Sequence, residues 1–232
     1  MRPTRFDELS SSYDDLLRDP LRDRFTGQES MFFHRRKSEL IRRFFRRRNI
    51  DTSRLRHLDV GCGKGELLSM LRADFKRSAG CDVSADMMRE ITGVETRVQT
   101  NPLQVPFEDG AFDLVTAVCV YHHVPPLSRL SLTQEIRRVL KPGGIFCIIE
   151  HNPRNPVTRL IVGRTPVDAD AILLPASEAW KLTAGAELLP VEQSYFLYFP
   201  QTLYRYVGWI EGLLAKVPLG GQYALFNQRP LA

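Results

Sequence analysis

The sequence contains no long hydrophobic run. No uninterrupted apolar stretch reaches the roughly 20 residues that a helix needs to cross a bilayer. The first five residues include two arginines and a proline, and the apolar segment of a secretory leader does not follow them. These absences predict a soluble protein that is not exported, and we expect it in the cytoplasm.

Cysteine is scarce and scattered, with only four residues, at positions 62, 81, 119 and 147. None belongs to a Cys-x-x-Cys pair or to a cysteine–histidine cluster with the spacing of metal ligands, so we expect no metal site. Each lies in or beside an apolar run, where a free thiol behaves as a small buried hydrophobic group. A reducing compartment suits this usage.

The positive charge is concentrated in one segment. The 232-residue chain has a net charge of +5, and residues 35–48 contain eight basic residues against one acidic residue, Glu39. Such a segment can contact an anionic membrane surface or a phosphorylated acceptor, or it can be a solvated helix face. No nucleic-acid-binding module accompanies it, so we expect no nucleic-acid partner.

Hydrophobic spacing divides the chain into a helical start and an α/β remainder. In residues 1–54, apolar side chains recur at three- and four-residue steps, as in a helix. From residue 55 onward, short apolar runs alternate with helical patterns, which indicates βαβ units and a parallel sheet. The predicted strands are 56–60, 77–82, 96–100, 112–118, 144–150, 194–199 and 223–228. The predicted helices are 65–73, 85–92, 131–140 and 204–216.

The segment Leu58–Gly65 is the most informative. An apolar strand leads into glycines at positions 61, 63 and 65, and glycine permits positive φ and the close approach of a ligand to the backbone. A pyrophosphate-binding loop has the spacing G-x-G-x-x-G, whereas this loop has G-x-G-x-G preceded by Asp59. A carboxylate there favours an ammonium group, so the loop suits a nucleoside that carries an amino acid better than NAD.

Asp82 ends the second predicted strand, seventeen positions after Gly65. Acidic residues at about this interval accept hydrogen bonds from ribose hydroxyls in nucleotide-binding α/β folds. The two features together predict a nucleoside site.

Three segments in the order seen here resemble the class I S-adenosylmethionine (SAM)-dependent methyltransferases, specifically the UbiE- and Type 11-like small-molecule enzymes. They are Leu58–Gly65, Val105–Val115 and Arg138–Gly144. The resemblance implies a Rossmann-like sheet of seven strands, with helices on both faces and an antiparallel last strand. It also implies an N-terminal helical lid at 1–54 and a methyltransferase domain at 55–232, with an insertion near 195–218.

The cofactor implied by the resemblance is S-adenosyl-L-methionine, and the product is S-adenosyl-L-homocysteine (SAH). We expect thirteen residues to contact it at the carboxyl ends of the strands. They are Tyr13, Asp59, Gly61, Cys62, Gly63, Gly65, Asp82, Val83, Met87, Asn101, Pro102, Leu103 and Val118.

Asn101 and Pro102 depart from the family pattern. Similar enzymes have aspartate followed by alanine there, and the two contact the adenine through a carboxylate and a backbone N–H. Proline has no N–H to donate. Because an asparagine side chain both donates and accepts, we expect Asn101 to make both adenine contacts.

Three histidines are candidates for proton transfer. His122 and His123 follow the fourth predicted strand, and His151 follows the fifth, so all three are expected near the methyl group. An imidazole near its free pKa can take a proton from a hydroxyl or amine. The alternatives are a packing role for His123 and a turn-forming role for the proline-rich loop at 152–156.

The sequence therefore predicts methyl transfer to an oxygen or nitrogen of a small, hydrophobic or aromatic metabolite. Aromatic residues at 195–209 suit such an acceptor. One alternative is a protein that keeps the fold and binds SAM without transfer. Another is a methyltransferase for a lipid-linked acceptor at the membrane surface. The sequence carries no signal for an oligomeric state.

Overall fold

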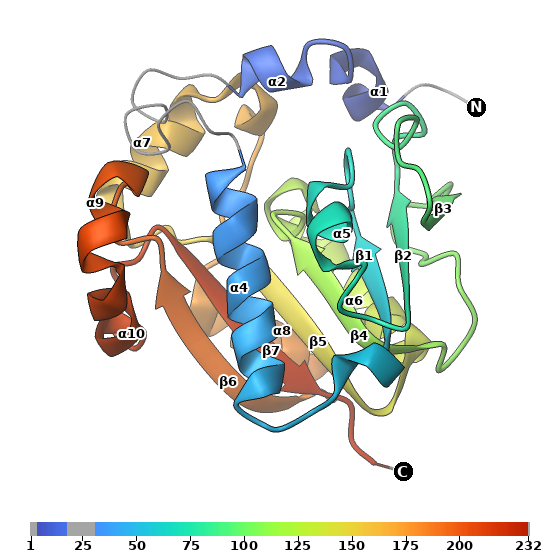
Figure 1. Ribbon diagram of the computed structural model, residues 1–232. Helices are drawn as coiled ribbons and strands as arrows, with labels where there is room; N and C mark the ends of the chain where they lie inside the picture. Colours follow the sequence, from blue (N-terminus) through green and yellow to red (C-terminus); the bar gives the residue numbers. More distant parts are fainter. Residues whose placement is uncertain (1–3, 18–30, 232) are drawn as a thin grey trace.

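The computed structural model describes residues 4–17 and 31–231, and it contains one seven-stranded sheet in the order β3-β2-β1-β4-β5-β7-β6 (Figure 1). The strands are β1 (Arg56–Val60), β2 (Arg77–Asp82), β3 (Glu95–Val98), β4 (Phe112–Val118), β5 (Leu140–His151), β6 (Leu189–Phe196) and β7 (Gln222–Gln228). The first five are parallel, and β7 runs antiparallel to both β5 and β6. The predicted fold class is confirmed.

Helices cover both faces of the sheet. One face carries α4 (Phe32–Arg46) and α5 (Glu66–Leu71), and the other carries α6 (Arg129–Val139) and α8 (Ala176–Gly185). In α4 the apolar spacing seen in the sequence becomes a buried stripe, and Phe44 stacks on Phe226 of β7 with ring centroids 4.0 Å apart. These contacts hold the basic helix against the sheet.

The remaining helices and turns lie at the edges of the sheet. They are α1 (Arg5–Leu9), α2 (Tyr13–Leu16), η1 (Thr52–Arg54), η2 (Tyr121–His123), η3 (Pro126–Ser128), α7 (Pro156–Arg164), η4 (Pro166–Asp168), α9 (Gln201–Val207), η5 (Gly208–Ile210) and α10 (Glu211–Leu214). Figure 1 places α1 and α2 above the carboxyl ends of the parallel strands. Within the described ranges, no helix is both long enough and apolar enough to cross a membrane.

The helix predicted at 85–92 is wrong, because this segment consists of turns. The Ser84 hydroxyl accepts the N–H of Met87 at 3.1 Å, and the next backbone bonds, from Arg89 to Asp86 and from Ile91 to Met88, span only three residues. A side chain that binds the nearby backbone competes with helix formation. Gly93, with φ +71°, then ends the segment.

The single helix predicted at 204–216 is also wrong, since α9 and α10 are separate and η5 lies between them. Gly208 stands at the break, where an added Cβ would lie 2.7 Å from the Tyr204 ring. Glu211 is drawn inward, and its carboxylate accepts the N–H of Tyr198 at 2.9 Å. A glycine in mid-helix and this long-range contact outweigh the local helical pattern.

Four strands have boundaries that differ from the prediction, and of these β7 differs least, since it begins one residue earlier, at Gln222. β3 is shifted toward the N-terminus by one to two residues, and β5 begins at Leu140 because the Lys141–Gly144 turn signal is taken into the strand as an irregular pairing with β4. β6 begins at Leu189, five residues before the predicted start, and it ends at Phe196, since Leu197 adopts φ +62° and turns the chain away.

Candidate functional site

A cavity of about 740 Å³ lies at the carboxyl ends of the parallel strands. This is where the strand order reverses around β1 and β4, the usual ligand position in open α/β sheets. The predicted site residues that line it are Tyr13, Asp59, Gly61, Cys62, Gly63, Asp82, Val83, Met87, Pro102, Leu103, Val118, His122, His123 and His151. Gly65 and Asn101 do not line it.

The glycine loop has the positive φ angles that its sequence predicts. Gly61, Gly63 and Gly65 have φ of +69°, +53° and +79°. A Cβ on Gly61 would lie 2.4 Å from Cγ2 of Val120, and one on Gly65 would lie 2.8 Å from Cδ1 of Ile91. Gly65 therefore serves the packing of the loop, whereas Gly61 and Gly63 also border the cavity.

Two buried carboxylates flank this loop. Asp82 accepts the backbone N–H of Gly63 at 2.8 Å through Oδ2 and that of Ser84 at 2.9 Å through Oδ1, and burial still raises its pKa. Asp59 accepts the hydroxyl of Thr116 at 2.6 Å, and burial raises the pKa of Asp59 to about 7. Each carboxylate can still accept further hydrogen bonds from a ligand, because a carboxylate offers about four lone-pair positions.

Asn101 lies outside the cavity lining and is exposed. Its side-chain Oδ1 accepts the N–H of Leu103 at 3.0 Å, which closes a local turn. Gln99, two residues earlier, is buried and lines the cavity, and its amide donates to the carbonyl of Pro102 at 2.8 Å. Gln99 was not among the residues predicted from the sequence, since only the sheet geometry brings it to the cavity.

The N-terminal helices close the cavity from above. α1 begins with a reciprocal cap between Thr4 and Asp7, and the other Asp7 oxygen accepts the Ser84 hydroxyl at 2.6 Å. The hydrogen bond from Ser84 lowers the pKa of Asp7 to about 2. In α2, Tyr13 faces the cavity beneath the ammonium of Lys64, which lies 5.8 Å from the ring centroid.

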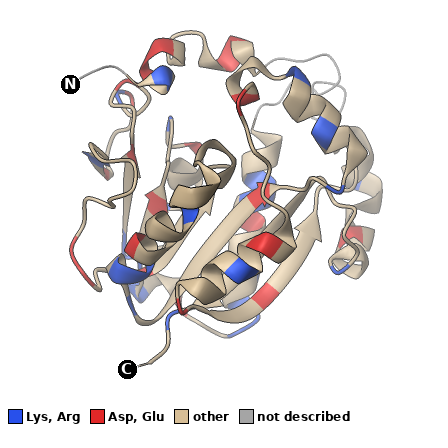
Figure 2. Cartoon of the chain, turned by 180° about the vertical axis from the view of Figure 1, so that it is seen from behind, with Lys and Arg blue, Asp and Glu red and all other residues tan. Residues whose placement is uncertain are grey.

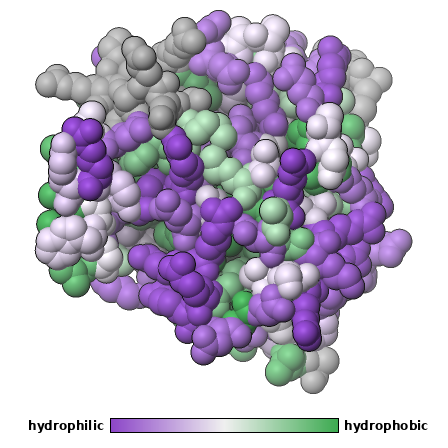
Figure 3. Space-filling view, viewed as in Figure 1, coloured by the Kyte–Doolittle hydropathy of each residue, from purple (hydrophilic) through white to green (hydrophobic). Residues whose placement is uncertain are grey.

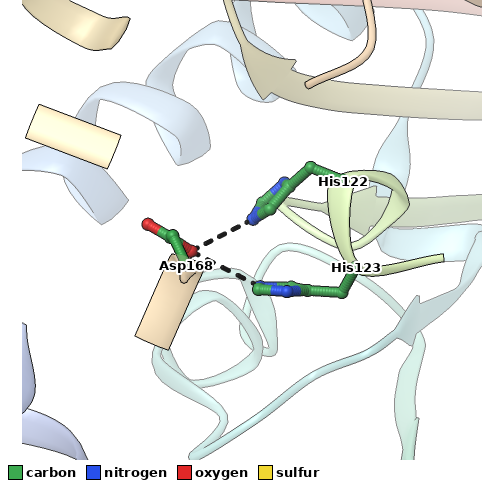
Figure 4. Close-up of side chains that lie close together, drawn as sticks. All are labelled: His122, His123 and Asp168. Atoms are coloured by element: carbon green, nitrogen blue, oxygen red, sulfur yellow. Dashed lines mark ion pairs between the residues drawn. The ribbon is translucent and has the colours of Figure 1, made fainter. Parts of the chain in front are cut away.

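The histidines gather at the opposite end of the cavity, where Asp168 joins them. His122 Nδ1 lies 2.6 Å from Glu150 Oε2, and the Nε2 atoms of His122 and His123 lie 3.4 and 3.5 Å from Asp168 Oδ1 (Figure 4). Burial alone would lower the pKa of His122, but Glu150 and Asp168 outweigh it and raise that pKa to about 10. Burial and the neighbouring His122 lower the pKa of His123 to about 4.

His151 lies beside this group and has fewer contacts. Its ring centroid is 5.1 Å from that of His122, and its Nδ1 lies 3.5 Å from the side-chain amide of Gln222. His151 also contacts Cys119, whose pKa it lowers. Among the three predicted histidines, this one has neither ring nitrogen paired with a carboxylate in the described contacts.

Lys37 and Cys119 form a second polar pair in the cavity. The Lys37 side chain enters from α4, is buried, and places Nζ 3.6 Å from Cys119 Sγ, which Gln222 also approaches at 3.4 Å. Burial opposes the thiolate, yet Lys37 and His151 lower the pKa of Cys119 to about 7. Sequence spacing offered no signal for this pair, because 82 positions separate its members.

The basic segment at 35–48 is mostly paired within the chain. Arg36 contacts Glu39 and Glu211, Arg42 contacts Asp74, and Arg47 and Arg48 contact Glu192. In the described segments seen from behind, basic and acidic residues are interspersed (Figure 2). These pairs support the interpretation of the segment as a solvated helix face.

Comparison with known proteins gives matches to methyltransferases. A family model described as a methyltransferase domain matches residues 58–148, from β1 to β5. An uncharacterized methyltransferase from Synechocystis is 35% identical over 102 residues, which are 42% of this chain and 48% of the relative. A demethylmenaquinone methyltransferase from Thermus thermophilus is 34% identical over 107 residues, with coverage of 42% and 48%. The match thus spans about half the length of these relatives.

The similarity of fold extends further along the chain. A SAM-dependent methyltransferase from Archaeoglobus fulgidus superposes with a TM-score of 0.61 at 17% identity, covering 86% of this chain and all of that one. At this identity the superposition establishes the fold alone.

Proposed function

We propose, from the premise that this chain contains a class I SAM-dependent methyltransferase domain, that it transfers the methyl group of SAM to an oxygen or nitrogen of a small, mainly apolar metabolite. The observation that carries this proposal is the continuity of one cavity from the glycine loop to the histidines. Its volume of about 740 Å³ lies in the range of roughly 300–1,000 Å³ typical of small-molecule sites, and it is large enough for two ligands side by side.

The cofactor end provides groups that match an adenosyl amino acid. In our proposal, Asp82 accepts the ribose hydroxyls and the Gly61–Gly63 backbone passes along the methionine part. Asp59 faces the ammonium group, whose charge favours the ionised carboxylate. Within the predicted lid at 1–54, α1 and α2 would cover the cofactor, residues 1–3 and 18–30 lie outside the described residues, and α4 packs on the sheet of the domain that is predicted from residue 55 onward.

The adenine contact has two candidates. Asn101 stays a prediction that requires its turn to open, whereas Gln99 already lines the cavity and has an amide with both donors and an acceptor. Measurement of SAH affinity for Asn101→Ala and Gln99→Ala decides between them, because only the variant that removes the adenine contact loses affinity.

The acceptor end provides proton-accepting groups. Methyl transfer is an in-line displacement, in which the acceptor lone pair attacks the methyl carbon and the carbon–sulfur electrons return to sulfur. Alignment therefore supplies much of the rate, up to roughly 7–11 kcal/mol. We propose His151 as the base for an acceptor proton, while the two carboxylates around His122 assign that residue to positioning.

Calorimetric titration with SAM, SAH and NAD tests the proposal. Saturable binding of SAM and SAH, no binding of NAD, and a loss of affinity in Asp82→Ala support it. Asp86→Ala is the matched control, because Asp86 lies four residues away, pairs with Arg89 and does not line the cavity. Transfer of a labelled methyl group to a panel of phenols, alcohols and amines then identifies the acceptor class. SAM binding without transfer to any acceptor class would favour the non-catalytic alternative.

An exposed apolar surface on α9 and α10 supports a second candidate, in which the acceptor is lipid-linked and reached at a membrane surface. Leu203, Tyr206, Trp209 and Leu213 are exposed by 51, 64, 72 and 75%. Tyrosine and tryptophan suit the interface between water and lipid. In Figure 3, which has the orientation of Figure 1, hydrophobic areas occur at the left, where α9 and α10 lie, on a face that is otherwise mainly hydrophilic.

Liposome sedimentation tests this second candidate. Wild-type protein is expected to sediment with vesicles, and the double variant Trp209→Ser, Leu213→Ser is expected to stay in solution. Arg47→Ser, Arg48→Ser in the basic segment is the matched control. Equal sedimentation of wild type and the α9–α10 variant would contradict the candidate.

A further inference from the structure

We propose that His122, His123 and Asp168 bind one divalent transition-metal ion, of the kind Zn²⁺ represents, at the acceptor end of the cavity. Their ligand atoms all lie within 4.8 Å of one another, and no other group of three or more such side chains does so in the described ranges. Figure 4 shows both imidazoles directed at the same carboxylate. The spacing of residues in the sequence does not predict this site, because Asp168 lies 45 residues after His123.

The distances match the edges of a coordination sphere. Zn²⁺ binds histidine nitrogen and carboxylate oxygen at about 2.0–2.2 Å, so two ligands of a tetrahedral ion lie about 3.3–3.5 Å apart. The Nε2 atoms of His122 and His123 lie 3.4 and 3.5 Å from Asp168 Oδ1. A charge-assisted N–H···O hydrogen bond would bring these atoms to about 2.7–2.9 Å.

A carboxylate fixes the tautomer of the first ligand. Glu150, fully buried in β5, lies 2.6 Å from His122 Nδ1 and is itself held by the N–H groups of Val120 and Tyr121 at 2.9 and 2.7 Å. This contact places the proton on Nδ1 and turns the Nε2 lone pair toward Asp168. Metal-binding histidines usually donate their second N–H to a carboxylate in this way.

One ion can bind all three groups at once, in place of the proton that otherwise lies between His122 Nε2 and Asp168. When the ion displaces that proton, His122 stays protonated on Nδ1 alone and its Nε2 lone pair lies beside the Asp168 oxygen, which His123 Nε2 also approaches. Protonation of both rings would place two cations side by side, with ring centroids 4.1 Å apart. A divalent cation accepts the three lone pairs at once. His123 Nδ1 has no partner in the described contacts, so His123 is the less constrained ligand.

The chain holds Asp168 in place from two sides. Arg5 of α1 donates to the carbonyls of Pro166 and Val167 at 3.1 and 3.3 Å, which fixes η4. The N–H of Ile172 donates to the carbonyl of His122 at 2.8 Å, and this bond ties the segment after η4 to the histidine turn. The lid helix thus helps to complete the metal site.

Three protein ligands leave an open coordination position toward the cavity, the arrangement of catalytic zinc sites. Resting on the proposed function, we infer that an acceptor hydroxyl occupies this position. The metal lowers the pKa of the hydroxyl, the proton passes to His151 and then to solvent, and the oxygen lone pair attacks the methyl carbon. The carbon–sulfur bond breaks, its electrons stay on sulfur, and SAH forms.

Titration of the metal-free protein with Co²⁺ and Zn²⁺ tests the site without any acceptor. We expect one Co²⁺ per chain with the visible absorption of a four- or five-coordinate ion, displaced by Zn²⁺. His123→Ala and Asp168→Ala are expected to lose this spectrum, and Glu150→Gln to weaken metal affinity by about 10–100-fold. Glu66→Ala is the matched control, because Glu66 is also a carboxylate that lines the cavity but stands at the start of α5, beside the glycine loop.

Circular dichroism and SAH titration of each variant establish that the fold persists. Absence of stoichiometric binding in wild type, or binding that His123→Ala and Asp168→Ala leave unchanged, would overturn the proposal. Metal binding by a protein that does not bind SAM would uphold the site and contradict the proposed function. SAM binding by a protein that binds no metal would support the proposed function and contradict the metal site.

Discussion

Asp82 Oδ2 accepts the backbone N–H of Gly63 at 2.8 Å, so the acid at the end of β2 directly holds the glycine loop that follows β1. The same carboxylate accepts the N–H of Ser84 through its other oxygen. A residue predicted to bind ribose therefore also shapes the loop on which the rest of the nucleoside would lie.

We predict that Asp82→Asn lowers SAH affinity by tenfold or more while the protein stays folded. One carboxylate oxygen is replaced by an NH2 group, which cannot accept a hydrogen bond, and hydrogen bonds to charged groups contribute about 1.5–3 kcal/mol. Calorimetry gives the affinity, and Asp86→Asn is expected to match wild type. Unchanged affinity in Asp82→Asn would show that neither the loop contact nor the ribose contact matters for binding.

We predict that SAM affinity falls as pH drops below about 7, because the pKa of Asp59 is about 7 in the folded protein. Above this pH the carboxylate is charged and attracts the ammonium group, whereas below it a proton must leave before binding. The limiting slope is tenfold per pH unit. Calorimetry in buffers of different ionisation enthalpy should detect proton release near pH 6.5, and Asp59→Asn should abolish this pH dependence. A SAM affinity of the wild-type protein that does not change with pH would contradict the assignment of Asp59 to the ammonium group.

We predict that Gly61→Ala destabilises the protein more than Gly110→Ala does. Both glycines have positive φ, +69° and +60°, so both substitutions incur a backbone cost of about 1–2 kcal/mol. A Cβ at Gly61 also meets Val120 at 2.4 Å, while one at Gly110 meets nothing within 4 Å. Overpacking adds about 1–3 kcal/mol. Urea denaturation measures the free energy of unfolding of both variants. Equal losses of stability in Gly61→Ala and Gly110→Ala would exclude a clash with Val120.

We predict that Cys119 is alkylated by iodoacetamide at neutral pH before the other three cysteines. Lys37 and His151 lower its pKa to about 7, while burial raises the pKa of Cys62, Cys81 and Cys147. The rate should rise through pH 7 and level off above pH 8, since the thiolate is the nucleophile. Peptide mass spectrometry assigns the modified site.

Two controls sharpen the alkylation experiment. Lys37→Met removes the nearby ammonium and should slow modification at pH 7, whereas Lys64→Met changes a cavity lysine that pairs with Asp14 and should not. SAH should protect Cys119 if the ligand fills the cavity. Equal rates in Lys37→Met and wild type would remove Lys37 as the cause of the lowered pKa.

We predict that Asp7→Asn speeds SAH dissociation by about tenfold, because Asp7 joins α1 to Ser84 at 2.6 Å. Glu8→Gln is the matched control, since Glu8 is the next residue and is exposed. Stopped-flow displacement measures the rate, and hydrogen exchange of residues 4–17 should slow on SAH binding in wild type. Exchange that SAH leaves unchanged would argue against a lid.

The sequence by itself determined the sheet and the cofactor end of the cavity. Positive φ at Gly61 and Gly63 requires glycine within a single turn, and Asp82 ends a strand whose apolar pattern is local. Such features depend on neighbours in the chain, so residue order alone reveals them. The parallel α/β sheet follows from these patterns, whereas the antiparallel last strand and most of the cofactor candidates were implied by the resemblance to methyltransferases.

Only the tertiary structure decided which groups meet across the cavity. Lys37 reaches Cys119 from α4, Asp168 reaches the histidines from η4, and Gln99 replaces Asn101 on the lining. The late helix breaks at Gly208 because Glu211 is drawn toward Tyr198. Each of these outcomes depends on contacts between segments that are distant in the sequence. The spacing of residues within one segment therefore does not predict them.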